Sequence, residues 1–467
     1  MKPQLVKRML CILTIFLFIQ THPKIFVNPS TTIGSRQVGI RIGNTLDENR
    51  ASIGEIVTKS RTINQPGNYI LGNDIDGTIV IAEENVWLNL NGYTIFESTG
   101  ISNGIVIEKG ARDITIINGN IDGNQNPPTN GAIGILINEA ELVNIENVYV
   151  LDFPKGIGIS LIGTDSSFPI KGCNIKNCIV SNCKKGIFAD HVINSTFANV
   201  EAKDCFEYGF LLENSRFNVL HACKALNIYG PSTHAIAGFA FQDSSNNLLK
   251  ECIAKYIVNT NNIISLATAA GFHFWTNSPN NEIINCHASS MSSNYFAYGI
   301  YANDYCTIVN NHIQGLASSY IAAGISATKN CYLEHNTIFN IPADLNTRQR
   351  SIDPIEPAPP TTGPEKSYGI YIANGDNIIR NNSINKITWE KPTGTGEAYG
   401  IYSDTATNII DGNTVDNISS GIGIKHHTDD MFIKNISFNN TSDFDPMTRA
   451  YDLTTGTTIG PYDNVYQ

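Results

Sequence analysis

A repeat of about 25 residues restricts this chain to a small set of architectures. The segment GIYANDYCTIVNNHIQGL begins at Gly299, and a related segment, GISATKNCYLEHNTIFN, begins at Gly324. Each copy starts with Gly, places Ile and Ala at alternate positions, and carries Cys and then Asn at matching positions further along. Alternation with a period of two inside such a repeat predicts short strands that stack once per repeat.

The same start recurs along most of the chain, at Gly104, Gly134, Gly156, Gly186, Gly209, Gly238, Gly271, Gly299, Gly324, Gly369, Gly400 and Gly421. Successive starts are 21 to 33 residues apart, except for 45 between Gly324 and Gly369, so the loops vary while the strands stay constant. When Gly is counted as the first position, the second and fourth positions are almost all apolar. This pattern predicts that those two positions face inward and that the third and fifth face outward.

A single coil of this kind cannot bury its apolar side without neighbours above and below it. Leucine-rich repeats have a similar period, but their L-x-x-L-x-L pattern is missing here. We therefore predict an all-β chain, a single right-handed parallel β-helix (a solenoid) of about 12–14 coils with an N-terminal cap.

A second column crosses the coils at the turn after the later apolar run, and its expected members are Cys178, Val200, Cys223, Cys252, Cys286, Asn311, Asn336, Asn381 and Asn435. Stacked Asn amides can hydrogen-bond from coil to coil, and thiols fill the same slots as small apolar groups. None of the nine cysteines outside the signal peptide forms a C-x-x-C pair, so we expect most of them to be buried thiols rather than a zinc site.

The two ends of the chain differ from the repeats. Residues 1–21 place Lys2, Lys7 and Arg8 before a short apolar run, which predicts a secretory signal peptide and hence a secreted or extracytoplasmic protein. We expect a linker and N-terminal cap over residues 22–65, with a short helix in LDENRASIGEIV, and the β-helix over residues 66–440. Residues 441–467 read as a polar C-terminal tail or cap.

Composition restricts the partners. The formal net charge is -11, and only 16% of the residues are charged, which argues against nucleic acid as a partner. No second stretch is apolar enough to span a membrane, so we expect no transmembrane anchor in the mature chain. The pair His426-His427 beside Asp429-Asp430 reads as a solvated turn, and we predict neither a metal nor a cofactor.

The segments PGNYILGNDIDGTIVIAEENVWLNLNGYTI and GIVIEKGARDITIINGNIDG, with the repeated G-I-x-I and N-x-I units, resemble the pectate-lyase-like superfamily of right-handed parallel β-helix proteins. The likeness is greatest to the generic repeat class near polygalacturonases and NosD-like proteins, and it covers about residues 66–440. Asn120-Ile121-Asp122 matches part of the N-T-D motif of polygalacturonases, and Gly423-Ile424-Lys425 resembles their R-I-K motif. Their G-H-G and paired Asp motifs are absent, so the resemblance implies the fold and leaves the activity to be argued from this chain.

The outward third and fifth positions of the repeats predict a binding face. We expect Asp190 and Glu213 to lie on adjacent coils and, with His273, to be the candidate catalytic residues. The candidate ligand-binding residues are Gln242, Trp275, Tyr301, Tyr371, Tyr402 and Asp404. Sugars stack on aromatic rings and hydrogen-bond to carboxylates and amides, so the expected partner is a polysaccharide or another glycan.

Three functions agree with these patterns. The first is an exported protein with a carbohydrate-binding groove on one strand face. The second is a polysaccharide-active enzyme, namely a glycoside hydrolase, lyase or epimerase, and the third is a non-catalytic surface, adhesion or structural protein. The insertions at 341–368 and 386–399 precede neighbouring strands and could form one wall of the groove.

Overall fold

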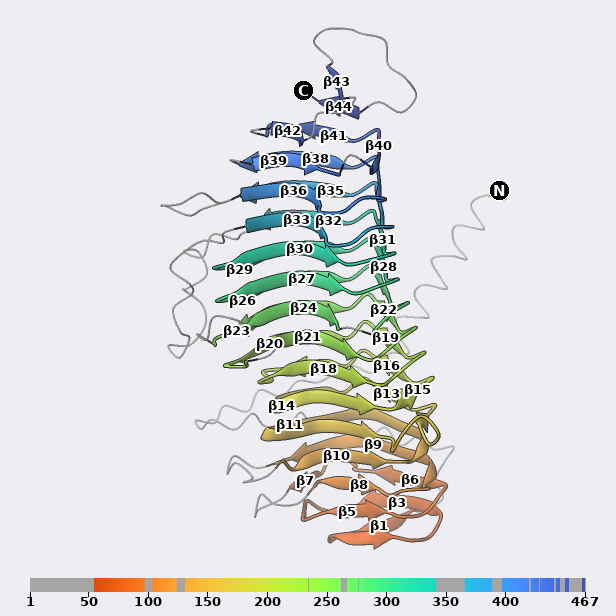
Figure 1. Ribbon diagram of the computed structural model, residues 1–467. Coiled ribbons are helices and arrows are strands. Elements are labelled where there is room, and N and C mark those ends of the chain that lie inside the picture. The colour runs from red at the N-terminus through yellow and green to blue at the C-terminus, as the bar shows by residue number, and fades with distance from the viewer. Residues whose placement is uncertain are drawn as a thin grey trace, which may run out of the picture. The chain divides into compact units, whose positions relative to one another are not determined.

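The computed structural model describes residues 54–96, 103–123, 131–233, 235–261, 267–275, 277–341, 366–388, 397–419, 421–427 and 429–440, together with the backbone of 442–445, 450–452 and 464–466. Every regular element in these ranges is a strand, and none of them contains an apolar helix of membrane-spanning length. The strands stack coil upon coil in parallel (Figure 1). The predicted right-handed parallel β-helix is therefore confirmed. The signal peptide and most of the linker and cap predicted over 1–65 lie outside the described residues.

The first of three parallel ladders, sheet 1, contains the strands that begin near the repeated glycines. Its members are β2 (Arg61–Ile63), β5 (Ile79–Ile81), β8 (Ile105–Ile107), β10 (Ile133–Asn138), the ends of β11 (Glu141–Ile162) and β14 (Ile179–Asp190), β18 (Tyr208–Glu213), β21 (Ala235–Gln242), β24 (Thr268–Phe274), β27 (Phe296–Ala302), β30 (Ile321–Ala327), β33 (Lys366–Ile372), β36 (Glu397–Ser403), β39 (Gly421–Lys425) and β42 (Ser442–Asp445).

Sheet 2 follows sheet 1 within each coil. It consists of β1 (Glu55–Val57), β3 (Gly67–Leu71), β6 (Val86–Asn89), the starts of β9 (Arg112–Asp122) and β11, β13 (Asn174–Lys176), β16 (Thr196–Ala198), β19 (Val219–His221), β22 (Leu248–Lys250), β25 (Glu282–Ile284), β28 (Thr307–Val309), β31 (Tyr332–Glu334), β34 (Ile378–Arg380), β37 (Ile409–Asp411) and β40 (Met431–Ile433).

Sheet 3 completes each coil. Its strands are β4 (Ile75–Asp76), β7 (Thr94–Phe96), the end of β9, the middle of β11, the start of β14, β17 (Glu201–Lys203), β20 (Lys224–Gly230), β23 (Ile253–Asn259), β26 (His287–Ser293), β29 (His312–Ser318), β32 (Thr337–Ile341), β35 (Ser383–Thr388), β38 (Thr414–Ser419), β41 (Ile436–Phe438) and β44 (Asn464–Tyr466). Two short pairs stand apart, β12 (Ile170–Lys171) with β15 (Val192–Ile193), and β43 (Ala450–Asp452) with β44.

The stack begins earlier than the first coil read from the sequence. Strands β1 and β2 precede Pro66 and already pair with β3 and β5. Residues 55–57, the end of the segment expected to form a short helix, are strand β1. At the other end, β42 pairs with β39 and β44 pairs with β41, so parallel pairing continues into the segment expected to be a tail.

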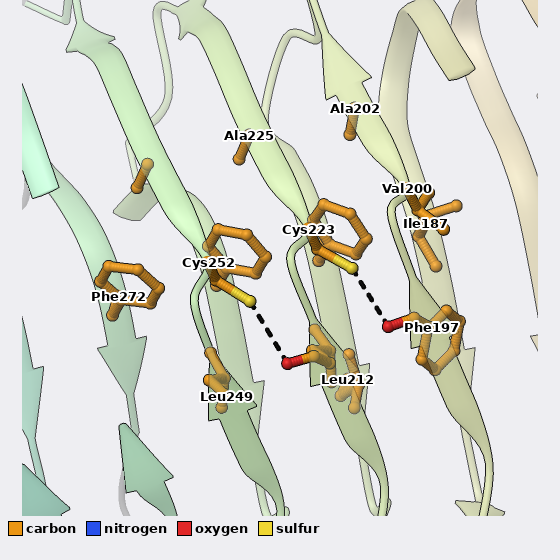
Figure 2. Close-up of a cluster of buried hydrophobic side chains, with 14 of the residues drawn as sticks. Ile187, Phe197, Val200, Ala202, Leu212, Cys223, Ala225, Leu249, Cys252 and Phe272 are labelled. Carbon is orange, nitrogen blue, oxygen red and sulfur yellow. Dashed lines mark hydrogen bonds between the residues drawn. The ribbon is translucent and has the colours of Figure 1, made fainter. Parts of the chain in front are cut away.

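The interior is filled by side chains that stack on their counterparts in the next coil. Phe210, Phe239 and Phe272 form one column, with ring centroids 4.7 and 5.0 Å apart and nearly parallel planes. Aliphatic side chains and small residues fill the space between such columns (Figure 2). Because each coil buries its apolar side only against the next, the core extends along the whole described stack.

The repeated glycine forms an inward bulge in sheet 1. In β27, Ala297, Gly299 and Ile300 are buried while Tyr298 and Tyr301 are partly exposed, so two consecutive residues face inward at the glycine. A Cβ atom on Gly299 would come within 2.3 Å of the Ile313 side chain and 2.6 Å of the Gly324 carbonyl oxygen. Only glycine allows this bulge against the core.

Two of the starts read from the sequence are displaced by two residues. The glycines that continue the column are Gly158 and Gly423, since their carbonyl oxygens face Gly134 and Gly400. Both starts lie in the sequence Gly-Ile-Gly-Ile, in which a shift by two residues preserves the inward and outward alternation. Ser160, expected in the outward fifth column, therefore takes the outward third position, in register with Phe188, and it is fully buried there.

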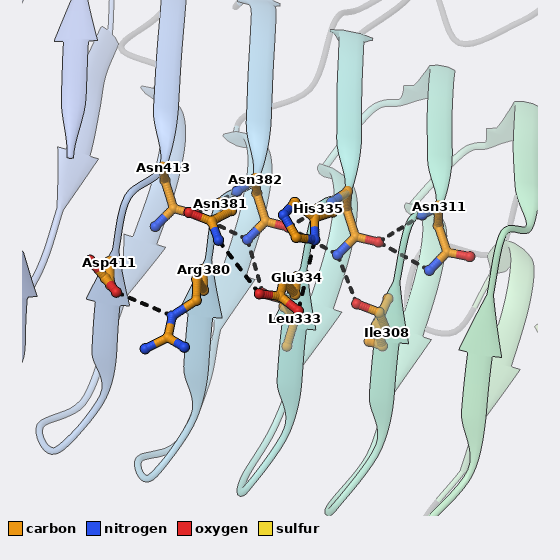
Figure 3. Close-up of polar contacts among 11 residues, drawn as sticks. Ile308, Asn311, Leu333, Glu334, His335, Arg380, Asn381, Asn382, Asp411 and Asn413 are labelled. Carbon is orange, nitrogen blue, oxygen red and sulfur yellow. Dashed lines mark hydrogen bonds and ion pairs between the residues drawn. The ribbon is translucent and has the colours of Figure 1, made fainter. Parts of the chain in front are cut away.

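The predicted Asn column is present, with one residue corrected. The Nδ2 atom of Asn311 donates to Oδ1 of Asn336 at 3.0 Å, and Nδ2 of Asn336 donates to Oδ1 of Asn382 at 2.9 Å. The series continues through Asn413 (Figure 3). Asn381, the residue expected here, instead has a φ of 52° and an amide that faces Glu334.

All nine cysteines of the described residues are buried and free, as the expected thiol columns require. The Sγ atoms of Cys223 and Cys252 each lie 3.3 Å from a carbonyl oxygen of the preceding coil (Figure 2). Asn336 makes the same kind of contact, because its Nδ2 donates to the Ile308 carbonyl at 2.8 Å. Thiol and amide therefore occupy equivalent slots in the column.

Candidate functional site

Three columns of side chains run along the outer face of sheet 1, in register from β14 to β39. The first precedes each glycine and holds Lys185, Tyr208, Ala237, Ala270, Tyr298, Ala323, Tyr368, Tyr399 and Ile422. The second holds Phe188, Leu211, Ala240, His273, Tyr301, Ser326, Tyr371, Tyr402 and Lys425. The third holds Asp190, Glu213, Gln242, Trp275, Asn303, Thr328, Ala373 and Asp404.

The first column was missed by the sequence reading, because strict alternation does not allow for the inward bulge at the glycine. A signal for it exists in the sequence. The tetrapeptide Tyr-Gly-Ile-Tyr occurs at 298–301, 368–371 and 399–402, and both of its tyrosines lie on the outer face. Lys425 was expected in the third column but pairs with Tyr402, so it belongs to the second.

One aromatic cluster covers the strands from β18 to β24. The rings of Tyr208 and Trp275 meet edge to face, 6.0 Å apart, although a whole strand lies between theirs. They can meet because the intervening strand carries the small residues Ala237 and Ala240 in the first two columns, and both alanines are buried beneath the rings. Trp275, expected to be an exposed stacking platform, is therefore partly packed into its own surface.

A second cluster is built by the Tyr-Gly-Ile-Tyr strands. The rings of Tyr368 and Tyr399 stack at 5.5 Å with an interplanar angle of 12°, and each contacts the second tyrosine of its own strand at 5.0 or 4.8 Å. Lys425 Nζ lies 5.2 Å from the ring centroid of Tyr402 and closes the cluster by a cation–π contact. Tyr371 and Tyr402 remain only partly covered.

A carboxylate borders this second cluster. The Tyr402 hydroxyl donates to Oδ1 of Asp404 at 3.1 Å. Burial, and then the negative charge of Asp404, raises the pKa of Tyr402 to about 12. The phenol is therefore a neutral hydrogen-bond donor at ordinary pH, next to an anionic acceptor. The structure thus brings three of the predicted ligand-binding residues together, namely Tyr371, Tyr402 and Asp404.

The two predicted carboxylates lie side by side at the other end of the face. Asp190 and Glu213 are partners in the β14–β18 ladder, and Gln242 is the partner of Glu213 in the next strand. The Nδ2 atom of Asn214 donates to Oδ1 of Asp190 at 2.9 Å. The imidazole Nδ1 of His191 lies 2.8 Å from the same oxygen.

His191 was not singled out in the sequence, where it is the residue directly after Asp190. Its φ of 54° lies in the left-handed region, where Asn, Asp and His are the commonest residues after Gly, and the equivalent residue in the following coil is Asn214. This left-handed conformation turns the imidazole back toward the preceding carboxylate. A histidine in a position that otherwise suits Asn was the available signal.

Glu213 differs from Asp190 in its surroundings. Burial raises the pKa of the Glu213 carboxyl, Lys185 lowers it, and the neighbouring Asp190 and Asp243 raise it again, with a net increase. The Nζ atom of Lys185 lies 4.5 Å from the ring centroid of Phe188, in a cation–π contact. The pair therefore consists of one carboxyl group that accepts a hydrogen bond from Asn214 and one whose pKa is raised.

His273 does not join the carboxylate pair. It lies two strands beyond Glu213, is 6% exposed, and stacks on Trp275 at a centroid distance of 4.5 Å. Its Nδ1 atom is buried without a hydrogen-bond partner, and burial lowers the pKa of the imidazole to about 3. The ring also contacts Tyr301, which makes His273 part of the aromatic surface.

A pocket of about 340 Å³ lies beside this face, at the corner where sheet 3 leads into sheet 1. It is lined by Pro154, Lys155, Lys184, Phe206, Glu207, Pro231 and Ser232. Within the described part of the chain, no three His, Cys, Asp or Glu side chains are placed to hold a metal ion. Most of the two insertions expected to wall the groove, 342–365 and 389–396, lies outside the described residues.

Comparison with protein-family models matches residues 103–259 to the family described as right handed beta helix region. A search of curated protein sequences finds no significant match. Among solved structures, the A-module of a mannuronan C-5 epimerase from Azotobacter vinelandii is 17% identical, with 74% of this chain and 90% of that chain covered and a TM-score of 0.47. Pre-mature gene product 12 of bacteriophage phi29 is 14% identical, with coverage of 82% and 51% and a TM-score of 0.44.

A periplasmic alginate epimerase is 12% identical, with 73% of this chain and 75% of that chain covered and a TM-score of 0.41. Such values concern the fold alone. The family match covers the coils from β8 to β23, and the same three-sheet pairing continues on both sides of them. The chain is a right-handed parallel β-helix protein, as its resemblance to the pectate-lyase-like superfamily implied.

Proposed function

We propose that this protein is exported and binds a linear glycan along the outer face of sheet 1. The observation that carries the proposal is the series of aromatic side chains on this face, in which Tyr208 lies on β18, Trp275 directly after β24, Tyr301 on β27, Tyr371 on β33 and Tyr402 on β36. Rings of this kind offer flat apolar surface to the carbon-bound hydrogens of a sugar.

Polar groups accompany the rings along one side. The third column places carboxylate, amide or hydroxyl groups along most of the face, including Glu213, Gln242 and Asn303. Sugar hydroxyl groups need such partners, because each hydroxyl removed from water must find another hydrogen bond. The charged and short apolar start of the sequence supports export, which would bring the face to extracellular or periplasmic glycans.

A glycan array with the mature protein tests the proposal. The variant Tyr371→Ala removes a partly exposed ring, and we expect it to weaken binding of any array ligand by roughly tenfold, the value of one lost aromatic contact. Phe168→Ala is the matched control, because Phe168 is 66% exposed but lies on the loop before β12, outside sheet 1. Equal loss in both variants, or no binding of any array glycan, would favour a purely structural or adhesive role.

A further inference from the structure

We propose that Asp190 and Glu213 hydrolyse the bound glycan with retention of anomeric configuration, Asp190 as nucleophile and Glu213 as general acid and base. The proposal rests on glycan binding by sheet 1 and adds to it a reaction, the role of each carboxylate and a direction for the bound chain. The observation behind it is that Asp190 and Glu213, which are register partners on adjacent strands, have different neighbours.

Two neighbours of Asp190 approach the same carboxylate oxygen, and one of them, Asn214, donates a hydrogen bond to it. Asn214 Nδ2 and His191 Nδ1 both lie within 2.9 Å of Oδ1, from two different chain positions. The hydrogen bond from Asn214 orients the carboxylate through Oδ1 and leaves Oδ2 for a substrate atom. A nucleophile positioned in this way attacks without first losing rotational freedom.

The neighbours of Glu213 favour the protonated form. Burial raises its pKa most, Lys185 opposes the shift, and the charges of Asp190 on β14 and of Asp243 in the turn after β21 raise the pKa further. Tyr208 lies on the same strand, and its pKa is raised by burial and then by the charges of Glu207 and Glu213. Two carboxyl groups whose surroundings differ in this way divide into an acid and a nucleophile.

The spacing selects the stereochemistry. Residues in register on adjacent parallel strands are about 4.8 Å apart, and their side chains project from the same face. Retaining glycosidases hold their carboxyl groups roughly 5–5.5 Å apart, whereas inverting enzymes need about 6.5–9.5 Å to admit a water molecule between carboxylate and sugar. The backbone spacing of these register partners is therefore closer to the retaining separation than to the inverting one.

The reaction balances with water as the only co-reactant. In the first step Asp190 Oδ2 attacks the anomeric carbon, the glycosidic C–O bond breaks, and Glu213 gives its proton to the departing oxygen. In the second step a water oxygen attacks the anomeric carbon, Glu213 takes a proton from that water, and the ester to Asp190 breaks. Both carboxyl groups return to their starting states.

This arrangement gives the glycan a direction. The anomeric carbon must lie over Asp190 on β14, and the leaving oxygen over Glu213 on β18. The reducing-end part of the chain then runs toward β24 and β36, across Trp275 and the tyrosine cluster. Binding to these rings would hold the leaving part of the substrate.

The test uses the tightest-binding oligosaccharide of the array and its 4-methylumbelliferyl glycoside. We expect new reducing ends from the oligosaccharide, and a first product with the anomeric configuration of the substrate by NMR. Asp190→Asn should abolish release from both substrates. Glu213→Ala should lower the rate on the oligosaccharide by roughly 10²–10⁴-fold but lower it far less on the aryl glycoside, whose leaving group needs no proton.

Two controls keep the assignment open to refutation. Azide added to Glu213→Ala should give the glycosyl azide of retained configuration, a product that a merely misfolded variant cannot form. Glu282→Gln removes an exposed carboxylate from sheet 2 and should leave the rate unchanged. Binding without cleavage, or an inverted product, overturns this assignment while glycan binding stands, whereas absence of binding overturns the proposed function itself.

Discussion

At the scale of single residues, the two carboxylates of sheet 1 show how register produces unequal groups from similar residues. The raised pKa of Glu213 means that its ionised form is disfavoured in the folded protein relative to the unfolded chain. The resulting destabilisation is complete above the folded-state pKa. It disappears as the pH falls below the unfolded value of about 4.3, where the carboxyl is protonated in both states.

Glu213→Gln should therefore stabilise the protein at pH 7 and have no effect near pH 3. Because the side chain is partly exposed, solvent screening limits the gain to on the order of 0.5 kcal/mol. Thermal unfolding of both proteins across this pH range measures the effect. A gain that persisted at pH 3 would show that the amide, and not the lost charge, is responsible.

The Asn column makes a second prediction for single residues. Replacement of Asn336 by Leu removes the acceptor of the Asn311 backbone N–H and the donor to the Ile308 carbonyl, both in a fully buried turn. We expect a loss of about 1–3 kcal/mol. Cys252→Ala, in the equivalent slot, leaves only a small cavity and should lose about 1–2 kcal/mol. Chemical denaturation compares the two, and a neutral Asn336→Leu would contradict the inferred hydrogen-bond column.

The column itself could be read from the sequence, but its alignment to a single residue could not. At 381–382 two Asn residues stand together, and only the backbone decides which one enters the turn. Asn382 faces inward, whereas Asn381 adopts the left-handed conformation that Asn tolerates well. Both positions suit Asn, so residue type carried no information about the choice.

At the scale of the strand, the glycine bulge explains both the successes and the failures of the sequence pattern. Alternation correctly separated Ile300 from Tyr301, since these residues follow the bulge. It could not place Tyr298, because two inward residues in succession reverse the alternation before the glycine. A strict period of two therefore could not predict the first column of the outer face.

The bulge predicts a strong effect of added side-chain volume. A Cβ atom at Gly324 would lie 2.5 Å from Ile338 Cγ2 and 2.6 Å from the Gly369 carbonyl oxygen, so Gly324→Ala should destabilise the stack by about 1–3 kcal/mol. Gly131→Ala is the control, since its nearest neighbouring atom would be 3.9 Å away. Melting temperatures of the two variants decide the matter, and equal values would argue against a glycine-specific bulge.

At the scale of the whole stack, the fold was predictable because nearly every repeat shows the same glycine and apolar pattern and so predicts the same strand. The candidate site occurs once, and its parts come from strands separated by loops of different length. Register placed Asp190 beside Glu213 as expected, but no pattern in the sequence indicated the approach of Tyr208 to Trp275 across an intervening strand. Contacts of that kind depend on which side chains are small, here Ala237 and Ala240.

The stack also sets a length scale for the proposed ligand. Six successive strand pairings separate β18 from β36, which corresponds to about 29 Å between Glu213 and Asp404 at roughly 4.8 Å per strand. A linear pyranose chain advances by a similar distance per sugar, so about seven units are needed to contact both ends of the face. Once a chain reaches both clusters, the second contact becomes intramolecular.

Affinity should therefore rise with chain length, increase by roughly 10²-fold when both clusters are bridged, and then level off. Tyr402→Ala should reduce the affinity for oligosaccharides of seven or more units and leave that for trisaccharides bound at the carboxylate end unchanged. Isothermal titration calorimetry with a length series measures both effects. If the variant weakened short and long ligands equally, the tyrosine cluster would belong to the same subsite as the carboxylates, and the glycan could not run along the stack from β14 to β36.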